Sequence, residues 1–308
     1  MYPLLPATLL FSSALMVPYL PVDREVYAMG TRLSFHLEGN GRAAEPLLAE
    51  VARIEAACST WQRESVWSRL NAAGGVAMSL EPEWLQLLSR VQAWSLETSG
   101  AFDPILMPLV QTWALRAGGR IPTPGERTEA MAHCGSALLR LDAKAGTAQL
   151  SDPMAGLEEG GFLKGYALDA ARRTAAAHGA SSGWLNFGGQ ILAWGRPFEV
   201  QIAHPRDRHR PALRMFLANA SLSSSGCSER GSHILDPRTG EPRSNWGTVS
   251  VVCPSALDAD VLSTALFVMG PVQGLAWAES RRIPAVFEPH EGPVLMTGAF
   301  QNLHPTLF

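Results

Sequence analysis

The segment Ser255 to Gly270 (SALDADVLSTALFVMG) places oxygen-bearing side chains on an otherwise apolar predicted helix. At about 100° per residue, Asp260, Ser263 and Thr264 share one arc of this helix, opposite an apolar side. Phe267 lies in the same arc and the helix carries no Lys, Arg or Glu, which is unusual for a solvated face. A buried carboxylate needs compensation, and a hard cation such as Mg²⁺ would provide it. A solvated polar face is the alternative that spacing leaves open.

A second candidate is His233, within Ser223 to Pro242 (SSSGCSERGSHILDPRTGEP). His233 precedes a short apolar pair and a DPRTG turn, so we expect it at the end of a strand, where a general base would be displayed. A structural histidine is the alternative. The Ser- and Gly-rich start of the segment could present backbone N–H groups to an anion, although such runs also form ordinary turns.

A glycine-bearing turn followed by a lysine is a candidate phosphate site. Gly160 and Gly161 open a predicted helix whose first turn carries Lys164. Helix N-termini and nearby cations favour phosphate groups. The spacing matches neither the P-loop nor GxGxxG, so this is not a standard nucleotide motif. Asn186 to Gly189 (NFGG), after a predicted strand, is a further place where backbone could approach a ligand closely.

Aromatic and acidic residues earlier in the chain are weaker candidates. Trp61, within CSTWQRESVWSRLN (58–71), could stack on an aromatic ligand, but a single Trp also serves as core or as an amphipathic cover. Phe102 and Asp103, within AFDP, have adequate explanations as loop residues when each is considered singly.

The elements that must position these side chains follow from periodicity and turn residues. Helices are predicted at 44–58, 81–97, 164–178 and 256–269, the last with a capping box of Ser255 and Asp258. Strands are predicted at 26–37, 183–193, 197–203, 213–222 and 246–253, and residues 117–147 are assigned to loops and short strands. Strands in hairpin-like succession, with helices between groups, favour an α+β architecture.

Composition excludes some classes of function. The chain has 308 residues, with 25 Lys plus Arg against 28 Asp plus Glu, so it lacks the basic excess that nucleic acid binding needs. Hydrophobic residues make up 46% and charged residues 17%, which is typical of a folded globular protein. The four cysteines show no CxxC pair and no zinc-ligand spacing, so we expect neither a structural zinc nor a disulfide framework.

The first twenty residues (MYPLLPATLLFSSALMVPYL) are strongly apolar, but they contain three prolines and no basic n-region. We therefore expect no stable transmembrane span, and treat residues 1–24 as an atypical export signal or an apolar arm. Residues 25–308 are predicted to form a single domain.

Taken in order, these segments resemble the ApbE family of flavin transferases across roughly residues 26–290. The resemblance rests on MGT at 29–31, STW with SRLN at 59–71, SGAFDP at 99–104, GG with KGYALD at 160–169, NFGG at 186–189, SSG at 224–226, HILDPRTGEP at 233–242 and DADVLSTALFVMG at 258–270. Motifs that are weak individually become specific as a series.

The resemblance implies an ApbE-like, T-fold-related architecture of mixed and antiparallel sheets with packed helices, and an FAD cleft between two lobes. It implies that the flavin lies near Met29 and Trp61. The implied contacts of the dinucleotide are Ala101, Phe102, Asp103, Glu158, Lys164 and Ile234. The implied metal ligands are Asp260, Ser263, Thr264 and the backbone at Gly161, and His233 is our candidate for accepting a proton.

The implied activity is a Mg²⁺-dependent transfer of FMN from FAD to a threonine of an acceptor flavoprotein, with release of AMP. FAD pyrophosphatase activity, with water as the acceptor, is the first alternative, and a non-catalytic FAD carrier or assembly factor is the second. Many members of the family are exported or lipid-anchored, but this N-terminus has no lipid-anchor cysteine, so export and a cytoplasmic location both stay open.

The chain departs from the family pattern at three places. Glu158 stands where the family usually has Asp, and Leu163 where it has a small residue. The stretch between Gly226 and His233 is shorter than usual and lacks its common aromatic residue. These differences concern the surroundings of the FAD phosphates and of the acceptor.

Overall fold

An eight-stranded sheet forms the centre of the protein, which we describe from a computed structural model over residues 20–226 and 234–308. Every pair of neighbouring strands in it is antiparallel. In spatial order its strands are β1 (Val22–Ala28), β2 (Thr31–Gly39), β6 (Ala180–Phe187), β7 (Gln190–Trp194), β10 (Ala220–Gly226), β13 (Gly247–Cys253), β14 (Ala285–Pro289) and β15 (Leu295–Met296).

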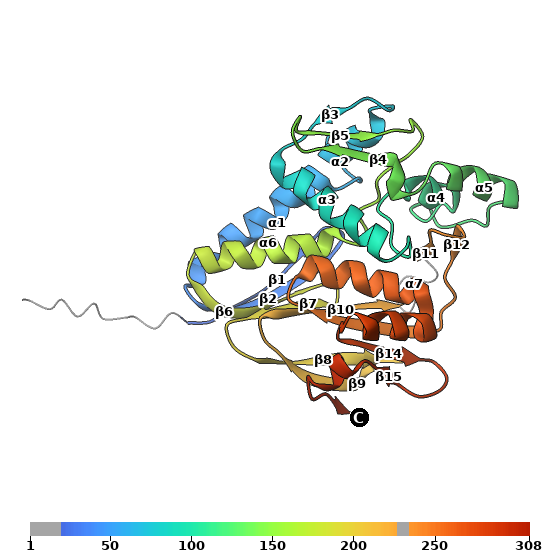
Figure 1. Cartoon of the computed structure of the whole chain (residues 1–308). Coiled ribbons are helices and arrows are strands. Elements are labelled where there is room, and N and C mark those ends of the chain that lie inside the picture. The colour runs from blue at the N-terminus through green and yellow to red at the C-terminus, as the bar shows by residue number, and fades with distance from the viewer. Residues whose placement is uncertain (1–19, 227–233) are drawn as a thin grey trace, which may run out of the picture.

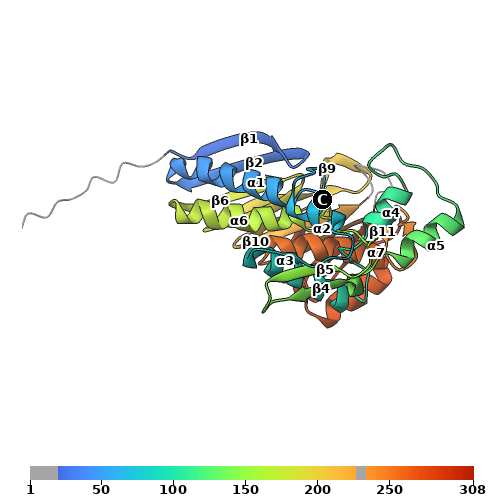
Figure 2. The same cartoon turned by 90° about the horizontal axis from the view of Figure 1, so that it is seen from above.

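Three long helices cover one face of this sheet: α1 (Ala44–Cys58), α6 (Leu163–Ala177) and α7 (Ala256–Ser280). Figure 2 shows them side by side, and α6 contacts both of the others. Buried residues of α1 recur at helical spacing (Leu47, Val51, Ile54, Cys58), while α6 presents small residues such as Ala167 and Ala171. The small residues allow the helices to approach closely, and together with the sheet they bury the main hydrophobic core.

The opposite face of the sheet is covered by a smaller sheet of β8 (Phe198–His204), β9 (Asp207–Leu217) and β16 (Thr306–Leu307), as Figure 1 shows. Alternating buried residues of this sheet, including Val200, Ile202, Leu213 and Met215, form a second core with Leu222 of β10. The central sheet is therefore buried on both faces.

The remaining elements lie mainly beyond α1 and α6, at the top of Figure 1. They are α2 (Val66–Ala72), β3 (Met78–Ser79), α3 (Pro82–Glu97), α4 (Met107–Thr112), α5 (Pro124–Ala132), β4 (Leu139–Asp142) and β5 (Thr147–Leu150). Short pieces complete the described chain: η1 (Gly41–Ala43), η2 (Ser136–Leu138), β11 (Leu235–Asp236), β12 (Glu241–Pro242) and α8 (Gly298–Gln301).

The predicted α+β class is confirmed, and so are the helices predicted at 44–58, 81–97 and 164–178. The location of an FAD cleft between two lobes stays a prediction, as does the division into residues 1–24 and a single domain 25–308. Strand β1 begins at Val22, inside the first of these ranges.

Three predicted strands are each interrupted by a tight turn, so the prediction of continuous strands was wrong there. Residues 26–37 belong to a hairpin in which Ala28 pairs with Thr31. Its two turn residues, Met29 and Gly30, have φ angles of 46° and 71°, as in the two-residue turns whose twist matches that of the strands. The ranges 183–193 and 213–222 contain the β6–β7 and β9–β10 turns in the same way.

Helix α5 was missed, because residues 117–147 were assigned to loops and short strands. Its signal is a capping box in which Thr123 and Glu126 exchange side-chain and backbone hydrogen bonds, followed by Pro124 in the first turn. The glycine-rich flanks at 117–119 and 135 masked this signal.

Helix α7 contains a break at the residue where the predicted helix ends. Gly270 has a φ of 79° and is followed by Pro271, so the helical conformation is interrupted after Met269. Within the described part of the chain, α7 is long and apolar enough to span a membrane, but 61% of its most apolar window is buried inside the protein. It is accordingly the core helix of this fold.

Candidate active site

A cavity of about 1070 Å³ opens where β2, β10, α6, α7 and the loops above them meet. Its wall brings together residues from distant parts of the chain. Of the residues predicted from sequence, the wall contains Met29, Trp61, Ala101, Phe102, Asp103, Glu158, Gly161, Lys164, Ile234, Asp260 and Thr264. Ser263 does not line it, and His233 lies outside the described residues.

Met29 reaches the wall from the β1–β2 turn. A residue with a side chain is uncommon at its φ of 46°, and such strained backbone concentrates at functional sites. The hydroxyl of Tyr27 donates a hydrogen bond of 2.7 Å to the carbonyl of Gly30 and braces the turn.

Asp260 and Thr264 lie one turn apart on α7, both facing the cavity. Asp260 is 7% exposed, and its Oδ2 accepts a hydrogen bond of 3.0 Å from the backbone N–H of Gly165. Thr264 Oγ1 donates to the Asp260 carbonyl at 3.1 Å. A Cβ built on Gly161 would stand 3.6 Å from the same hydroxyl oxygen. Three of the four predicted metal ligands therefore meet in one place.

Ser263, the fourth predicted ligand, does not line the cavity. It is fully buried, and its hydroxyl donates to the Asp260 carbonyl at 3.0 Å. The same hydroxyl hydrogen-bonds to Ser223 at 3.1 Å and Ser225 at 2.9 Å on β10. Its contacts attach α7 to the sheet beneath the cavity.

The close packing of α6 on α7 fixes the position of the Asp260 carboxylate. A Cβ on Gly165 would lie 2.3 Å from the Ala256 carbonyl oxygen and 2.9 Å from Asp260 Cβ. Only a glycine therefore allows the backbone N–H at 165 to reach the carboxylate without a shift of one helix.

The N-terminus of α7 is capped differently from the prediction. Ser255 Oγ does accept from the N–H of Asp258, at 3.3 Å. The Asp258 carboxylate, however, binds Arg90 at 2.8 Å and the Trp94 indole at 2.6 Å, so the capping-box explanation of that residue was wrong. Asp169, at the end of the KGYALD motif, accepts the hydrogen bonds of the helix end instead.

The turn before α6 carries two carboxylates. Glu158 pairs with Arg116 and accepts from the Gly160 N–H at 3.3 Å, and Lys164 Nζ donates to the Gly160 carbonyl at 3.1 Å. Glu159 is buried and accepts from the Thr60 N–H at 2.9 Å. Burial, and next the charge of Glu159, raise the pKa of Glu158, while Arg116 lowers it.

Asp103 shapes the wall more than it faces a ligand. Its carboxylate accepts from the N–H groups of Ile105 and Ser136, both at 2.8 Å, and from the Ser95 hydroxyl. Burial raises the pKa of Asp103 and these hydrogen bonds oppose the increase. The neighbouring Phe102 packs edge-on to Phe162, with ring centroids 6.5 Å apart.

Two residues that the sequence did not single out contribute to the site: Arg116 lines the cavity, and Asp169 caps the helix that carries Asp260. Arg116 lines the cavity and lies over the Trp61 ring, with the guanidinium carbon 4.6 Å from the ring centroid. No local pattern marks an arginine in a loop that follows a six-residue helix. Asp169 was within a recognised motif, but its role depends on where α7 begins.

Comparison with known protein sequences finds members of one family. A model of the ApbE family matches residues 29–287. An FAD:protein FMN transferase of Treponema pallidum is 30% identical over 260 residues, covering 74% of this chain and 71% of that protein. An FAD:protein FMN transferase of Haemophilus influenzae is 26% identical over 262 residues, covering 78% and 76%.

Solved structures give the same result. The apo flavinyl transferase ApbE of Pseudomonas stutzeri has a TM-score of 0.85 and 28% identity, covering 94% of this chain and 98% of that chain. The ApbE protein of Thermotoga maritima has a TM-score of 0.87 and 26% identity, covering 92% and 99%.

Proposed function

Because this chain belongs to the ApbE family, we propose that it transfers FMN from FAD to a threonine hydroxyl of an acceptor flavoprotein, with Mg²⁺ as cofactor and AMP as the second product. The relatives named as FAD:protein FMN transferases support the transfer of a flavin to a protein. The Mg²⁺ requirement, the threonine and the release of AMP are our additions to that assignment.

The observation that carries the proposal is the cavity. Its volume of about 1070 Å³ lies at the upper end of the usual range for ligand pockets, roughly 300–1,000 Å³, as a dinucleotide would require. One wall offers an aromatic ring, Trp61, and another the start of α6 with Lys164. An isoalloxazine ring suits the first and a pyrophosphate suits the second.

The residues at Asp260 fit a divalent cation. The Gly165 N–H donates to Oδ2 of this carboxylate, and among the described residues no hydrogen bond reaches Oδ1. The carboxylate, the Thr264 hydroxyl and the backbone at Gly161 are hard oxygen donors of the kind that Mg²⁺ prefers. A bound Mg²⁺ would neutralise negative charge on the pyrophosphate.

The reaction exchanges the phosphoanhydride bond of FAD for a phosphoester bond to the acceptor. The acceptor oxygen forms a bond to the FMN phosphorus, the P–O–P bond of FAD breaks, and AMP leaves with the electron pair. The hydroxyl proton goes to a base, for which we propose His233 from its sequence context. Lys164 and the N–H groups at the start of α6 would hold the pyrophosphate in line with the acceptor.

The test is AMP release from FAD by the purified protein, with Mg²⁺ or EDTA, and with or without a candidate acceptor flavoprotein. We expect release that needs Mg²⁺ and acceptor, is lost in Asp260→Ala, and leaves FMN attached to the acceptor after denaturation. AMP release at the full rate without any acceptor would identify a pyrophosphatase instead. FAD binding without AMP release in every mixture would indicate a carrier and contradict the proposal.

The role of His233 as the base is tested separately, because the transferase assignment does not depend on it. His233→Ala should bind FAD with unchanged affinity and lose about 10²- to 10⁴-fold in rate, the usual contribution of a general base. Near-normal transfer at saturating FAD would remove His233 from the mechanism while leaving the transferase assignment intact.

A further inference from the structure

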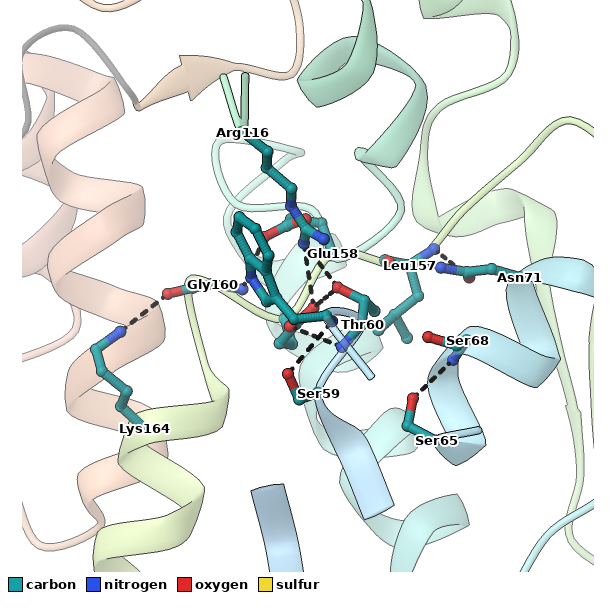
Figure 3. A network of polar contacts seen from close by, with 12 residues as sticks. Ser59, Thr60, Ser65, Ser68, Asn71, Arg116, Leu157, Glu158, Gly160 and Lys164 are labelled. Atoms are coloured by element: carbon teal, nitrogen blue, oxygen red, sulfur yellow. Dashed lines mark hydrogen bonds and ion pairs between the residues drawn. The ribbon is translucent and has the colours of Figure 1, made fainter. Parts of the chain in front are cut away.

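Arg116 connects three loops that line the cavity (Figure 3). Its guanidinium donates to the Thr60 hydroxyl at 2.7 Å and pairs with Glu158. It also approaches Glu159, with 3.6 Å between nitrogen and oxygen. Arg116 itself belongs to the turn after α4. One side chain thus ties the loops at 59–62, 113–118 and 158–161 to each other.

Arg116 also covers one face of Trp61. The guanidinium carbon is 4.6 Å from the centroid of the Trp61 ring, and this ring is 69% exposed. An exposed Trp on a loop would otherwise turn among several rotamers, and ordering such a side chain on binding costs affinity. The stacked cation holds the ring in one position beside the cavity before any ligand arrives.

The same guanidinium faces two carboxylates at the entrance to α6. Glu159 is 7% exposed, and burial raises the pKa of the adjacent Glu158. A pyrophosphate bound near Lys164 would lie close to both acids. Without that cation, the negative charge that the two carboxylates carry above the raised pKa of Glu158 would repel an anionic ligand there.

We propose that Arg116 is a positioning residue for flavin binding, with two separable effects: it holds Trp61 for stacking, and it offsets Glu158 and Glu159 so that the anionic part of FAD is admitted. The inference rests on the proposed function only in taking the ligand to be a flavin. Riboflavin, which has the ring but no phosphate, reports the first effect, and the ratio of FAD to riboflavin affinity reports the second.

The first experiment measures dissociation constants of riboflavin and FAD by fluorescence titration of wild type and Arg116→Met. Loss of one cation–π contact should weaken riboflavin about 3- to 10-fold, and FAD should weaken more than riboflavin. The control is Arg120→Met, which removes an exposed arginine of the same loop region that pairs with Glu126 at 2.9 Å. That variant should bind both ligands as wild type does.

A double-mutant cycle identifies the route through Trp61. If Arg116 acts on the ring by holding Trp61, Arg116→Met should not weaken riboflavin further in a Trp61→Leu background. Independent, multiplying effects of the two substitutions would overturn the first part of the proposal. Equal affinities of Arg116→Met and wild type for riboflavin would overturn it as well.

A triple variant without charge at these three positions isolates the second effect, the offset of Glu158 and Glu159. It also avoids leaving buried carboxylates without their cation, which could destabilise the fold of Arg116→Met. Arg116→Met combined with Glu158→Gln and Glu159→Gln leaves no uncompensated charge. It should bind riboflavin weakly, and its ratio of FAD to riboflavin affinity should equal or exceed that of wild type, because the wild-type cluster has more acidic than basic groups. A ratio as low as that of Arg116→Met would contradict the charge effect. If wild type bound neither riboflavin nor FAD, the proposed function would fail first, and this inference with it.

Discussion

The protein buries carboxylates in two regions that differ in the partners around them. Around the cavity, Asp260, Glu158 and Glu159 each have a hydrogen-bond donor or a cation within contact distance. On β14, Glu288 is 1% exposed and neither of its oxygens has a hydrogen-bond partner in the structure as described. Burial raises the pKa of both Glu158 and Glu288 to about 7, but Arg116 opposes the increase at Glu158, whereas burial is the one cause at Glu288.

The comparison separates buried carboxylates that have a hydrogen-bond donor or a cation beside them from a buried carboxylate that has neither. A partnered carboxylate has donors or a cation beside it that favour its charged form, and that form can bind a cation or repel an anion. An enclosed carboxylate without a partner takes up a proton and contributes a pH dependence of stability. Burial of an acid is therefore not sufficient evidence for a role in the reaction; the donors around it distinguish the two cases.

The largest expected effect comes from removing the charge at Asp260. Asp260→Asn keeps the shape of the side chain and removes the anionic oxygens, so the rate of AMP release should fall about 10³-fold or more at saturating FAD and Mg²⁺. Glu288→Gln is the matched control, because it neutralises an equally buried carboxylate away from the cavity wall. Comparable losses in both variants would end the distinction between the two regions.

Glu288 should contribute a pH dependence of stability that its own substitution removes. Its carboxyl holds its proton in the folded protein up to about pH 7, whereas the unfolded chain releases it near 4.5. Between these values the unfolded state binds fewer protons, so stability falls as pH rises, by about 3 kcal/mol in total. Urea unfolding of wild type and Glu288→Gln should therefore give similar stability at pH 4 and a more stable variant at pH 8. A difference that does not change with pH would show that Glu288 has a partner.

How well the sequence foretold these two regions depends on how local the determining contact is. The arc of Asp260 and Thr264 follows from helical period alone, and both residues do line the cavity. The capping box of α5 and the Met29–Gly30 turn also depend only on neighbouring residues. The prediction missed the first because of its glycine-rich flanks, and the second because strand-forming residues lie on both sides of it.

Other features depend on partners far along the chain and could not be inferred from spacing. Arg116 meets Thr60 and Glu158, which are 56 and 42 residues away. Glu288 follows an apolar run in β14, and its burial depends on the elements that pack around this strand in the folded protein. The direction of Ser263 depends on the serines of β10, since the helical arc that it shares with Asp260 is wide enough to face both the cavity and the sheet.

The α6–α7 contact should cost stability when it is widened. Gly165→Ala would place a Cβ 2.3 Å from the Ala256 carbonyl, and backbone at such a distance must move. We expect the free energy of unfolding in urea to fall by about 2 kcal/mol, within the usual range for overpacking. We also expect a higher Mg²⁺ concentration to be needed for half-maximal AMP release, because the Asp260 carboxylate loses the N–H that positions it. Gly125→Ala on α5, with open space around the added carbon, is the control and should be neutral or stabilising.

The smallest expected effect distinguishes the two hydroxyls that follow Asp260. Thr264 faces the cavity, so Thr264→Val should raise the Mg²⁺ concentration needed for half-maximal AMP release while the fold is retained. Ser263 donates to a backbone carbonyl and contacts two serines of β10, so Ser263→Ala should cost about 1 kcal/mol of stability and leave the Mg²⁺ requirement unchanged. Titration of both variants with Mg²⁺, beside urea unfolding, measures the two quantities separately. A higher Mg²⁺ requirement in Ser263→Ala would return Ser263 to the ligand set that the sequence predicts, and would mean that α7 turns when the ion binds.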